Sequence, residues 1–285
     1  MEQLINKKII DQAHGSSIVI NNVSKIYDPN GARVVALDGF SLNIKEGEFV
    51  AIVGPSGCGK STLLNILAGF DTLTNGEVYI DGKLAASQDK ALKPGSDRVV
   101  VFQNGSLFPW MTVLENVSYG LIKSGKYSKD EANNVATSLL SSSNLNDIAL
   151  SYPSQLSSGM QRRVEILRAL INNPSVLLLD EPFRAMDTVS KSLMHQHLLD
   201  IYDKYKKTIF FITHDLEEAI YLADTVVVMT TRPGTLKVTL DVNIARPRNK
   251  KSLLTENYKN LKRQAIASVH EEAKKAFERG ERELA

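Results

Sequence analysis

A glycine-rich stretch carries the clearest chemistry in this sequence. Residues 54–61 read Gly-Pro-Ser-Gly-Cys-Gly-Lys-Ser, the pattern of a loop that binds nucleotide phosphates. Glycines let successive backbone N–H groups turn toward one centre, and the helix that follows adds its N-terminal partial charge. Lys60 would then reach the β- and γ-phosphates, and the Ser61 hydroxyl would bind Mg²⁺. The expected nucleotide-binding residues here are Gly54, Pro55, Ser56, Gly57, Cys58, Gly59, Lys60, Ser61 and Thr62.

Two acids stand directly after an apolar run further along the chain. Asp180 and Glu181 follow residues 176–179, which read Val-Leu-Leu-Leu. At the carboxyl end of a parallel strand, Asp180 can face the Mg²⁺ held by Ser61, and Glu181 can polarise an attacking water. Alone, such a pair is more often a set of solvated loop acids. Beside a phosphate loop, the pair predicts a Mg²⁺-dependent nucleoside triphosphatase.

Strands buried on both faces must position these residues. Residues 49–53 form an apolar run without alternation, which is typical of a parallel strand covered by helices. The glycine loop follows it, and residues 63–68 predict a short helix that ends at Gly69. Residues 176–179 and 209–212 repeat the buried-strand pattern on either side of a helix expected over about 190–205. This alternation predicts an α/β fold with a parallel sheet.

Other segments complete the predicted organisation. Strands are expected at residues 17–23, 40–44 and 76–80, before the middle of the chain loses the strand signal. Residues 107–172 read as a helical insertion, with helices at 130–140 and 160–171. A half-exposed strand is expected over 236–244, where apolar and polar residues alternate.

The last forty residues form a compositional unit. Residues 246–285 hold 11 basic and 6 acidic side chains, whereas Lys plus Arg and Asp plus Glu nearly balance over the whole chain, at 34 and 32. Apolar residues at helical spacing predict one amphipathic helix. We expect a solvated charged helix rather than a patch for anionic lipid or nucleic acid.

Composition limits the class of protein. The 285 residues include 43% apolar and 23% charged residues, which is ordinary for a folded globular domain. No apolar run approaches the roughly 18 residues of a membrane-spanning helix, and the first residues do not read as a signal peptide. The single cysteine, Cys58, excludes an internal disulfide and a multi-cysteine metal site. Any metal is therefore expected to be held by oxygen.

The order of the motifs resembles that of ATP-binding cassette (ABC) proteins. Residues 156–161, Leu-Ser-Ser-Gly-Met-Gln, are similar to the family signature, and Gln103, Asp187 and His214 stand in the family's order. The resemblance covers about residues 17–245. It implies an α/β phosphate-loop NTPase fold of ABC type, with a mixed sheet that has a parallel core, an antiparallel β portion and a helical subdomain. The implied boundaries are an N-terminal extension at 1–16, the ATPase domain at 17–245 with its helical subdomain at about 104–172, and a basic amphipathic tail at 246–285.

The resemblance also implies roles for individual residues. Glu181, His214 and Gln103 would be catalytic, with His214 on the γ-phosphate and Gln103 reporting occupancy to a membrane subunit. Tyr27 would stack on adenine, although a tyrosine there also fits an ordinary edge strand. Two further sets are implied: the Mg²⁺ ligands Ser61, Gln103 and Asp180, and the residues Ser157, Ser158, Gly159, Met160 and Asp187 that complete the site of a second subunit in a head-to-tail dimer.

A narrower resemblance points to one branch of importers. Residues 97–103, 108–110, 213–219, 232–234 and 246–248 look like those of ATPase subunits that serve nitrate, sulfonates, taurine and bicarbonate. This implies an ATP-hydrolysing subunit at the cytoplasmic face of the membrane. Its partners would be a second ATPase subunit in a homodimer or heterodimer, an integral membrane permease and, indirectly, an extracytoplasmic solute-binding protein, with no nucleic acid.

Two other functions stay open at this point. One is a regulatory, weakly hydrolysing subunit of a heterodimer. The other is a soluble ABC ATPase that acts on nucleic acid, although such proteins usually carry two cassettes or long coiled-coil insertions. This chain has one phosphate loop and no such insertion.

The sequence departs from the family pattern at the dimer seam. Ser158 stands where the signature usually has its first glycine, residues 161–163 permute a usual Arg-Gln-Arg, and Arg184 replaces a small residue. If the backbone at Ser158 needs a positive φ, serine there would be strained and the dimer would close less tightly. Arg184 would offset that loss by pairing with an acid or a phosphate across the seam. The tail from residue 246 to 285 is expected to be regulatory or dimer-stabilising and to contribute nothing to the chemistry, so a chain truncated after Ile244 should still bind nucleotide.

Overall fold

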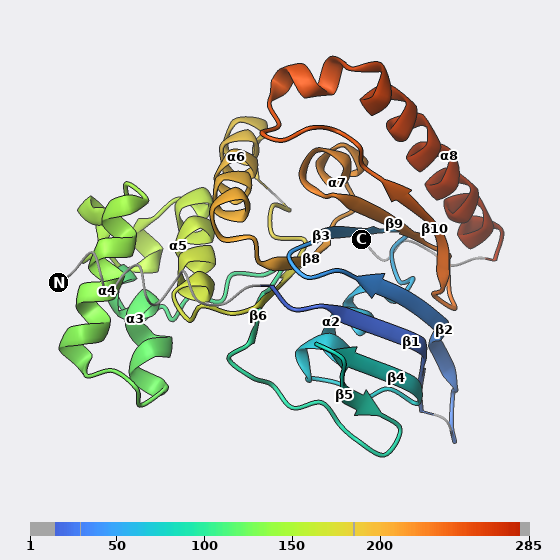
Figure 1. Cartoon of the computed structure of the whole chain (residues 1–285), viewed down its shortest axis with the longest axis horizontal. Helices are drawn as coiled ribbons and strands as arrows, with labels where there is room; N and C mark the ends of the chain where they lie inside the picture. The colour runs from blue at the N-terminus through green and yellow to red at the C-terminus, as the bar shows by residue number, and fades with distance from the viewer. Residues whose placement is uncertain (1–14, 29, 185, 280–285) are drawn as a thin grey trace.

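A six-stranded mixed sheet forms the centre of the protein in the computed structural model, which describes residues 15–28, 30–184 and 186–279 (Figure 1). Its order is β10-β9-β3-β8-β7-β6. Neighbouring strands from β9 to β6 pair in parallel, and β10 pairs antiparallel with β9. The strands are β3 (Phe49–Val53), β6 (Arg98–Val101), β7 (Val176–Asp180), β8 (Thr208–Ile212), β9 (Thr225–Met229) and β10 (Leu236–Asp241).

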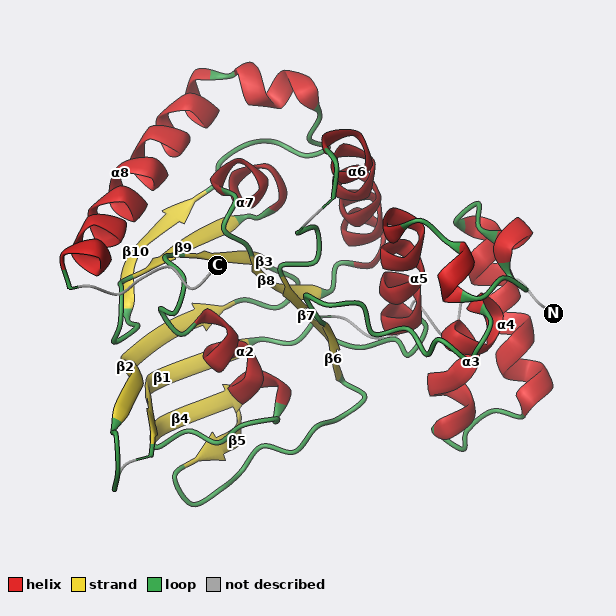
Figure 2. Cartoon of the chain, turned by 180° about the vertical axis from the view of Figure 1, so that it is seen from behind, coloured by secondary structure: helices red, strands yellow, loops and turns green. Residues whose placement is uncertain are grey.

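A second, antiparallel sheet packs over one face of the first. It has the order β2-β1-β4-β5, formed by β1 (Ile18–Tyr27), β2 (Val34–Ile44), β4 (Asn75–Ile80) and β5 (Lys83–Ser87). Helix α2 (Lys60–Ala68) lies between the two sheets, as Figure 2 shows. Its apolar side chains share one core with alternate residues of the central strands, such as Val50, Ile52 and Phe210. The helix that follows the phosphate loop is therefore held between two sheets.

A group of helices extends from the other side of the molecule. It contains α3 (Val113–Lys123), α4 (Lys129–Ser142) and α5 (Ser158–Leu170), with short 3-10 turns at Asn146–Ile148 and Pro153–Gln155. Capping boxes begin α3 and α4, because Thr112 and Ser128 each exchange hydrogen bonds with the glutamate three residues later. Figure 1 shows this helical subdomain beside α6, apart from α2.

Three helices cover the remaining face of the central sheet. They are α6 (Thr188–Tyr205), α7 (Leu216–Leu222) and the C-terminal α8 (Glu256–Glu278), which follows a 3-10 turn at Lys250–Leu254. The other alternate set of strand residues, including Ala51, Leu179 and Phe211, packs against them. Two separate apolar cores result, one on each face of the sheet.

The start of the tail is anchored in the cassette. The Arg248 guanidinium is buried and donates to the carbonyls of Ile220, Tyr221 and Ala223 at the end of α7. Arg246 pairs with Asp224 at 2.7 Å. Side chains of α8, among them Tyr258, Leu261 and Ala265, are buried against the same core. The amphipathic face of the tail is thus covered by its own chain.

The predicted fold class is confirmed. Both sheets, the parallel core, the helical subdomain and the C-terminal helix are present. The elements α3, α7, β5, β6 and β9 were not predicted from the sequence, and the strand expected at residues 17–23 covers only the first part of the ten-residue strand β1. Residues 1–14 of the proposed N-terminal extension lie outside the described residues. Within the described ranges, no helix has the length and apolarity needed to span a membrane.

Candidate functional site

The chemistry-bearing residues gather at one edge of the central sheet. Because β3, β7 and β8 run in parallel, their carboxyl ends meet at that edge. The phosphate loop follows β3, Glu181 follows β7, and His214 stands two residues after β8. The α/β topology therefore brings together residues that are up to 160 positions apart.

The phosphate loop is tightly organised by its own lysine. Lys60 is buried, and its Nζ donates to the carbonyl oxygens of Gly54 and Pro55 at 2.8 and 2.9 Å. Gly59 has a φ of 100°, and a Cβ at this position would stand 2.8 Å from the Ala36 carbonyl oxygen, so only glycine fits. The loop surrounds the ammonium group, which is the cation that a bound phosphate would meet.

A pocket of about 310 Å³ opens over this loop. It joins the phosphate loop to the end of β1, to β2 and to the loop after β9. Its lining consists of Tyr27, Val34, Ala36, Ser56, Gly57, Gly59, Lys60, Ser61, Thr62 and Glu181, together with Arg232.

Ser61, in the first turn of α2, lies next to Asp180 at the end of β7. The Ser61 side chain hydrogen-bonds the Asp180 carboxylate, and burial raises the pKa of that carboxyl while this bond lowers it. A hydroxyl and a carboxylate side by side are oxygen donors of the kind that Mg²⁺ prefers. The two residues therefore fit a magnesium site beside the phosphate loop.

Gln103 lies where the central sheet meets the helical subdomain. It lies two residues beyond β6, and its backbone carbonyl accepts a hydrogen bond of 2.7 Å from Arg162 of α5. Arg162 also donates to the Phe102 carbonyl and pairs with Glu165, and its guanidinium is nearly buried. Among the described residues, Gln103 does not line the phosphate-loop pocket. The structure ties its backbone to the helical subdomain instead.

Glu181 stands in a strained backbone conformation. Its φ is 42°, in the left-handed region that costs a non-glycine residue about 1–2 kcal/mol. Its N–H donates to the Ile212 carbonyl at 2.9 Å, which continues the pairing between β7 and β8. The carboxylate Oε2 lies 3.3 Å from Nδ1 of His214 and 3.4 Å from Nη1 of Arg184. The turn thus aims the carboxylate at the two side chains.

His214 is held by a turn with several hydrogen bonds. Thr213 donates its hydroxyl proton to buried Glu218 and accepts a bond of 3.0 Å from the N–H of Asp215. Asp215 then caps α7 through the N–H groups of Glu217 and Glu218. His214 itself is left on the open side of the turn, next to Glu181. The two side chains therefore lie side by side at the sheet edge, and the contact predicted between His214 and the γ-phosphate stays a prediction.

Tyr27 ends β1 at the rim of the pocket. Its hydroxyl donates to Asp71 at 2.6 Å, and the Lys25 ammonium lies 4.8 Å from the centre of its ring. The side chain is partly exposed and lines the pocket together with Val34 and Ala36. At Tyr27 only β2 pairs with β1, because the pairing with β4 ends at Ser24, so the stacking role of Tyr27 stays a prediction.

The signature residues lie on a different part of the chain. Ser157 caps α5 by accepting a bond from the Met160 N–H at 3.3 Å, and Ser157, Ser158 and Met160 are exposed. Asp187 caps α6 through the N–H groups of Val189 and Ser190. A Cβ on Gly159 would stand 3.4 Å from Met186, so the starts of α5 and α6 adjoin each other. Among the described residues, none of this set lines the phosphate-loop pocket.

Ser158 is not strained. It is the first residue of α5, and it is absent from the described residues that have a positive φ. The condition for strain therefore does not hold. The Arg184 guanidinium lies beside Glu181 of its own chain, so the acid it pairs with here is not across a subunit seam.

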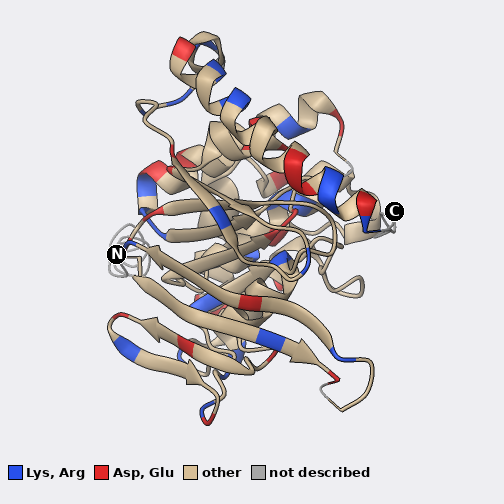
Figure 3. Cartoon of the chain, turned by 90° about the vertical axis from the view of Figure 1, so that its right-hand side faces the viewer, with Lys and Arg blue, Asp and Glu red and all other residues tan. Residues whose placement is uncertain are grey.

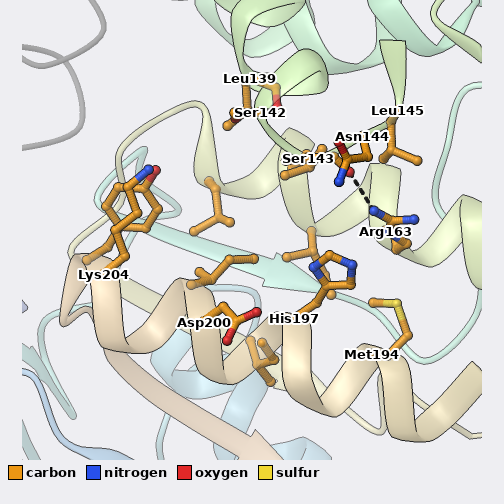
Figure 4. Close-up of a pocket in the computed structure, with 16 residues that line it drawn as sticks. Leu139, Ser142, Ser143, Asn144, Leu145, Arg163, Met194, His197, Asp200 and Lys204 are labelled. Carbon is orange, nitrogen blue, oxygen red and sulfur yellow. Dashed lines mark hydrogen bonds between the residues drawn. The ribbon is translucent and has the colours of Figure 1, made fainter. Parts of the chain in front are cut away.

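Two further hollows lie away from the phosphate loop. A cavity of about 310 Å³ lies between α4, α5 and α6, and its lining mixes apolar side chains with polar ones such as Arg163 and His197 (Figure 4). The Arg163 guanidinium donates to the Ser143 carbonyl across one end of it. A groove of about 410 Å³ runs along β6 to α3 and α5, lined by Phe102, Phe108 and Tyr119 among others.

The position of Arg232 at the phosphate-loop pocket was not predicted from the sequence. Residues 232–234 drew attention as a mark of lineage, with no role in the site. The structure brings Arg232 to the phosphate-loop pocket from the loop between β9 and β10. The signal in the sequence was a positive charge three residues after the end of a buried strand, β9.

Comparison with known proteins agrees with this geometry. The family model described as ABC transporter matches residues 37–184. An aliphatic sulfonates import ATP-binding protein of Bacillus thuringiensis is 41% identical over 236 residues, which cover 83% of this chain and 90% of that protein. A nitrate import ATP-binding protein of Synechocystis is 44% identical over 225 residues, covering 79% and 82%. Among solved structures, a dimeric ATP-binding cassette in a post-hydrolysis state with ADP and phosphate is 36% identical, with a TM-score of 0.69, and covers 79% of this chain and 99% of its own.

Proposed function

This chain belongs to the ABC transporter family of ATP-binding subunits, and on that premise we propose that it powers the import of a small anion through a separate membrane permease. The anion would be of the nitrate, sulfonate, taurine or bicarbonate type, because relatives named for sulfonate and nitrate import match most of the chain. The observation that carries the proposal is the meeting of Lys60, Asp180, Glu181 and His214 at one sheet edge.

ATP binding rests on the phosphate loop. Backbone N–H groups of residues 54–61 and the ammonium of Lys60 would hold the β- and γ-phosphates, and Tyr27 would stack on the adenine. Ser61 and Asp180 would hold Mg²⁺, which would neutralise charge on the phosphate oxygens. Gln103 would join the magnesium site once the helical subdomain brings its side chain closer.

Hydrolysis needs a residue that positions the attacking water. Glu181 is proposed to accept a proton from that water or to orient it. His214, 3.3 Å from the Glu181 carboxylate, would hold the water and contact the γ-phosphate. The strained turn at Glu181 keeps the carboxylate on the pocket side, where it lines the pocket with Lys60.

A second subunit is proposed to complete the site. The related cassette is dimeric, and in this chain the exposed start of α5 does not line the described phosphate-loop pocket. In a head-to-tail dimer, Ser157, Ser158, Gly159 and Met160 would face the γ-phosphate bound by the partner, with Asp187 at the same seam. The dimer is expected at the cytoplasmic face of the membrane, bound to the permease and through it to a solute-binding protein.

The groove beside α3 is the proposed contact for the permease. Trp110 is 69% exposed next to Phe108, whose ring centre is 5.6 Å away. An exposed aromatic pair beside an apolar groove is a common centre of binding energy. Arg162 connects this region to Gln103 through the backbone. A movement of the permease would therefore be transmitted from the groove through Arg162 to the backbone of Gln103.

Substitution of Trp110 tests the permease contact. Trp110→Ala should uncouple solute uptake from ATP hydrolysis while sparing nucleotide binding, because the side chain is largely exposed. Uptake by membrane vesicles and ATP binding would be measured in parallel, with thermal unfolding as the check on folding. A variant that unfolds instead would show that Trp110 is a locally packed residue.

Two observations separate the competing functions. Co-purification with a polytopic membrane protein supports the transporter subunit, and co-purification with nucleic acid or ribosomes in its place contradicts it. ATPase activity of the isolated chain bears on the regulatory alternative, because a regulatory subunit would bind ATP and hydrolyse it slowly.

A further inference from the structure

The loop between β9 and β10 packs directly on the phosphate loop. The Gly234 N–H donates to the Ala36 carbonyl at 2.9 Å, and the Asp38 N–H donates to the Gly234 carbonyl at 3.1 Å. A Cβ on Gly234 would fall 1.9 Å from the Cys58 carbonyl oxygen, so the two backbones touch. Residues 230–235, called here the arginine turn, are therefore fixed against β2 and the phosphate loop together.

The arginine turn carries a guanidinium group to the pocket. Arg232 lines the pocket with Lys60, Ser61 and Glu181, and its Nη2 lies 3.2 Å from where a Gly57 Cβ would stand. Gly57 is at the tip of the phosphate loop. The side chain is exposed, so its donors face solvent at the position where an anion would enter.

Helix α8 holds the arginine turn from behind. The buried Glu272 carboxylate accepts a bond of 2.9 Å from the Thr231 N–H, and Arg279 donates to the Arg232 carbonyl at 2.8 Å. Lys237 on β10 pairs with Glu272 at 2.7 Å. Burial opposes ionisation of this acid, but hydrogen bonds from Lys237, Lys275 and the Thr231 N–H lower the pKa of Glu272 to about 2. The carboxylate is thus ionised at neutral pH and acts as a fixed anchor.

The charges along α8 do not form a single-sign patch. Figure 3 shows both acidic and basic bands on this helix. Lys275 pairs with Glu271 and Glu272, and Lys262 pairs with Glu217 of α7. The pairs that α8 makes with Glu217 of α7 and with Lys237 of β10 hold the helix against the cassette beside the arginine turn.

We propose that Arg232 binds the phosphates of ATP and that α8, through Glu272 and Arg279, sets its position, so that the C-terminal tail tunes nucleotide affinity. A guanidinium group matches phosphate oxygens in geometry and in charge. The inference rests on the proposed function, since it requires ATP in this pocket. It differs from the expectation that the tail has no part in the chemistry.

Nucleotide affinity of the full-length chain tests the first half of the proposal. Arg232→Ala should weaken ATP binding about tenfold, because one charge-assisted contact to the phosphates is lost. Arg232→Lys should weaken it less, because lysine keeps the positive charge on a shorter side chain. Calorimetry would measure the affinity for ATP, and competition experiments would measure the affinity for adenosine. Adenosine competition should be unchanged, since adenosine has no phosphate. Equal weakening for adenosine, or unchanged ATP affinity, would overturn the phosphate contact.

A double-mutant cycle tests the role of α8. Glu272→Gln should raise the KM for ATP roughly threefold with kcat at saturating ATP unchanged, and it should add nothing in the Arg232→Ala background. The matched control is Glu271→Gln, the neighbouring acid, which pairs with Lys237 and Lys275. Full additivity of the two losses, or an equal effect of Glu271→Gln, would contradict the inference.

Two further variants distinguish a failure of this inference from a failure of the proposed function. Arg279→Ala removes an exposed contact, so its effect on KM does not depend on a buried acid that Glu272→Gln could destabilise. Lys60→Ala reports on the proposed function itself. If Lys60→Ala loses ATP binding and Arg232→Ala does not, only this inference fails; if Lys60→Ala binds ATP as the wild type does, the proposed function fails.

Discussion

The phosphate loop and the signature segment, residues 156–160, differ in how much of their environment this chain supplies. The loop is enclosed by β2, the arginine turn and Asp180 of β7, and its lysine is buried. The signature segment has one cap, an exposed helix start and a contact to Met186. A site can therefore be preformed on one side and depend on a second subunit on the other.

The largest effect is expected on the enclosed side. Glu181→Gln should lower the ATPase rate by about 10²–10³-fold, because the amide cannot accept the proton of the attacking water. ATP affinity should stay close to that of the wild type, since the carboxylate does not bind the phosphates. Steady-state hydrolysis and calorimetric binding would be compared. Hydrolysis at the wild-type rate would show that Glu181 is not the base.

The next effect concerns the loop itself. Lys60→Ala should weaken ATP binding about 10–100-fold, because it removes the buried ammonium that would meet the phosphates. Gly54 and Pro55 also lose a donor to their carbonyls, so thermal unfolding should be recorded beside the binding isotherm. Binding retained within twofold would contradict the preformed loop.

The smallest effect is expected on the open side. Ser158→Gly should change dimer affinity by no more than about twofold, because Ser158 starts α5 in a helical conformation and no left-handed strain is there to relieve. Ser158→Ala serves as the control, because it removes the hydroxyl without the loss of helix propensity that glycine brings. Markedly tighter dimers with glycine would restore the interpretation that serine impairs the signature.

Much of the enclosed side was predictable from the sequence. The phosphate loop and the acids after β7 are local patterns, each following a buried strand, and a parallel sheet brings such patterns to one edge. Arg232 and the anchor at Glu272 were not predictable, because the first follows a short turn and the second lies some forty residues later. Their contact depends on the path of α8 across the sheet, which periodicity does not reveal.

The role of Gln103 stays a prediction. Its side chain does not line the described pocket, and its backbone carbonyl accepts a bond from Arg162 of the helical subdomain. The position of that subdomain relative to the sheet is a tertiary property. Charge composition marked the tail from residue 246 as a separate unit, and it did not reveal that Arg248 is buried against α7 or that Arg246 pairs with Asp224.

ATP-dependent dimerisation of the Glu181→Gln chain tests the central claim most directly. We expect the preformed phosphate loop of one chain and the exposed signature segment of a second chain to form one ATP site together. Sedimentation velocity should show monomers with ADP, dimers with ATP, and a return to monomers when Gly159→Asp places a like charge at the signature. Monomers with ATP at all concentrations, or ATP-dependent dimers that Gly159→Asp leaves intact, would contradict it.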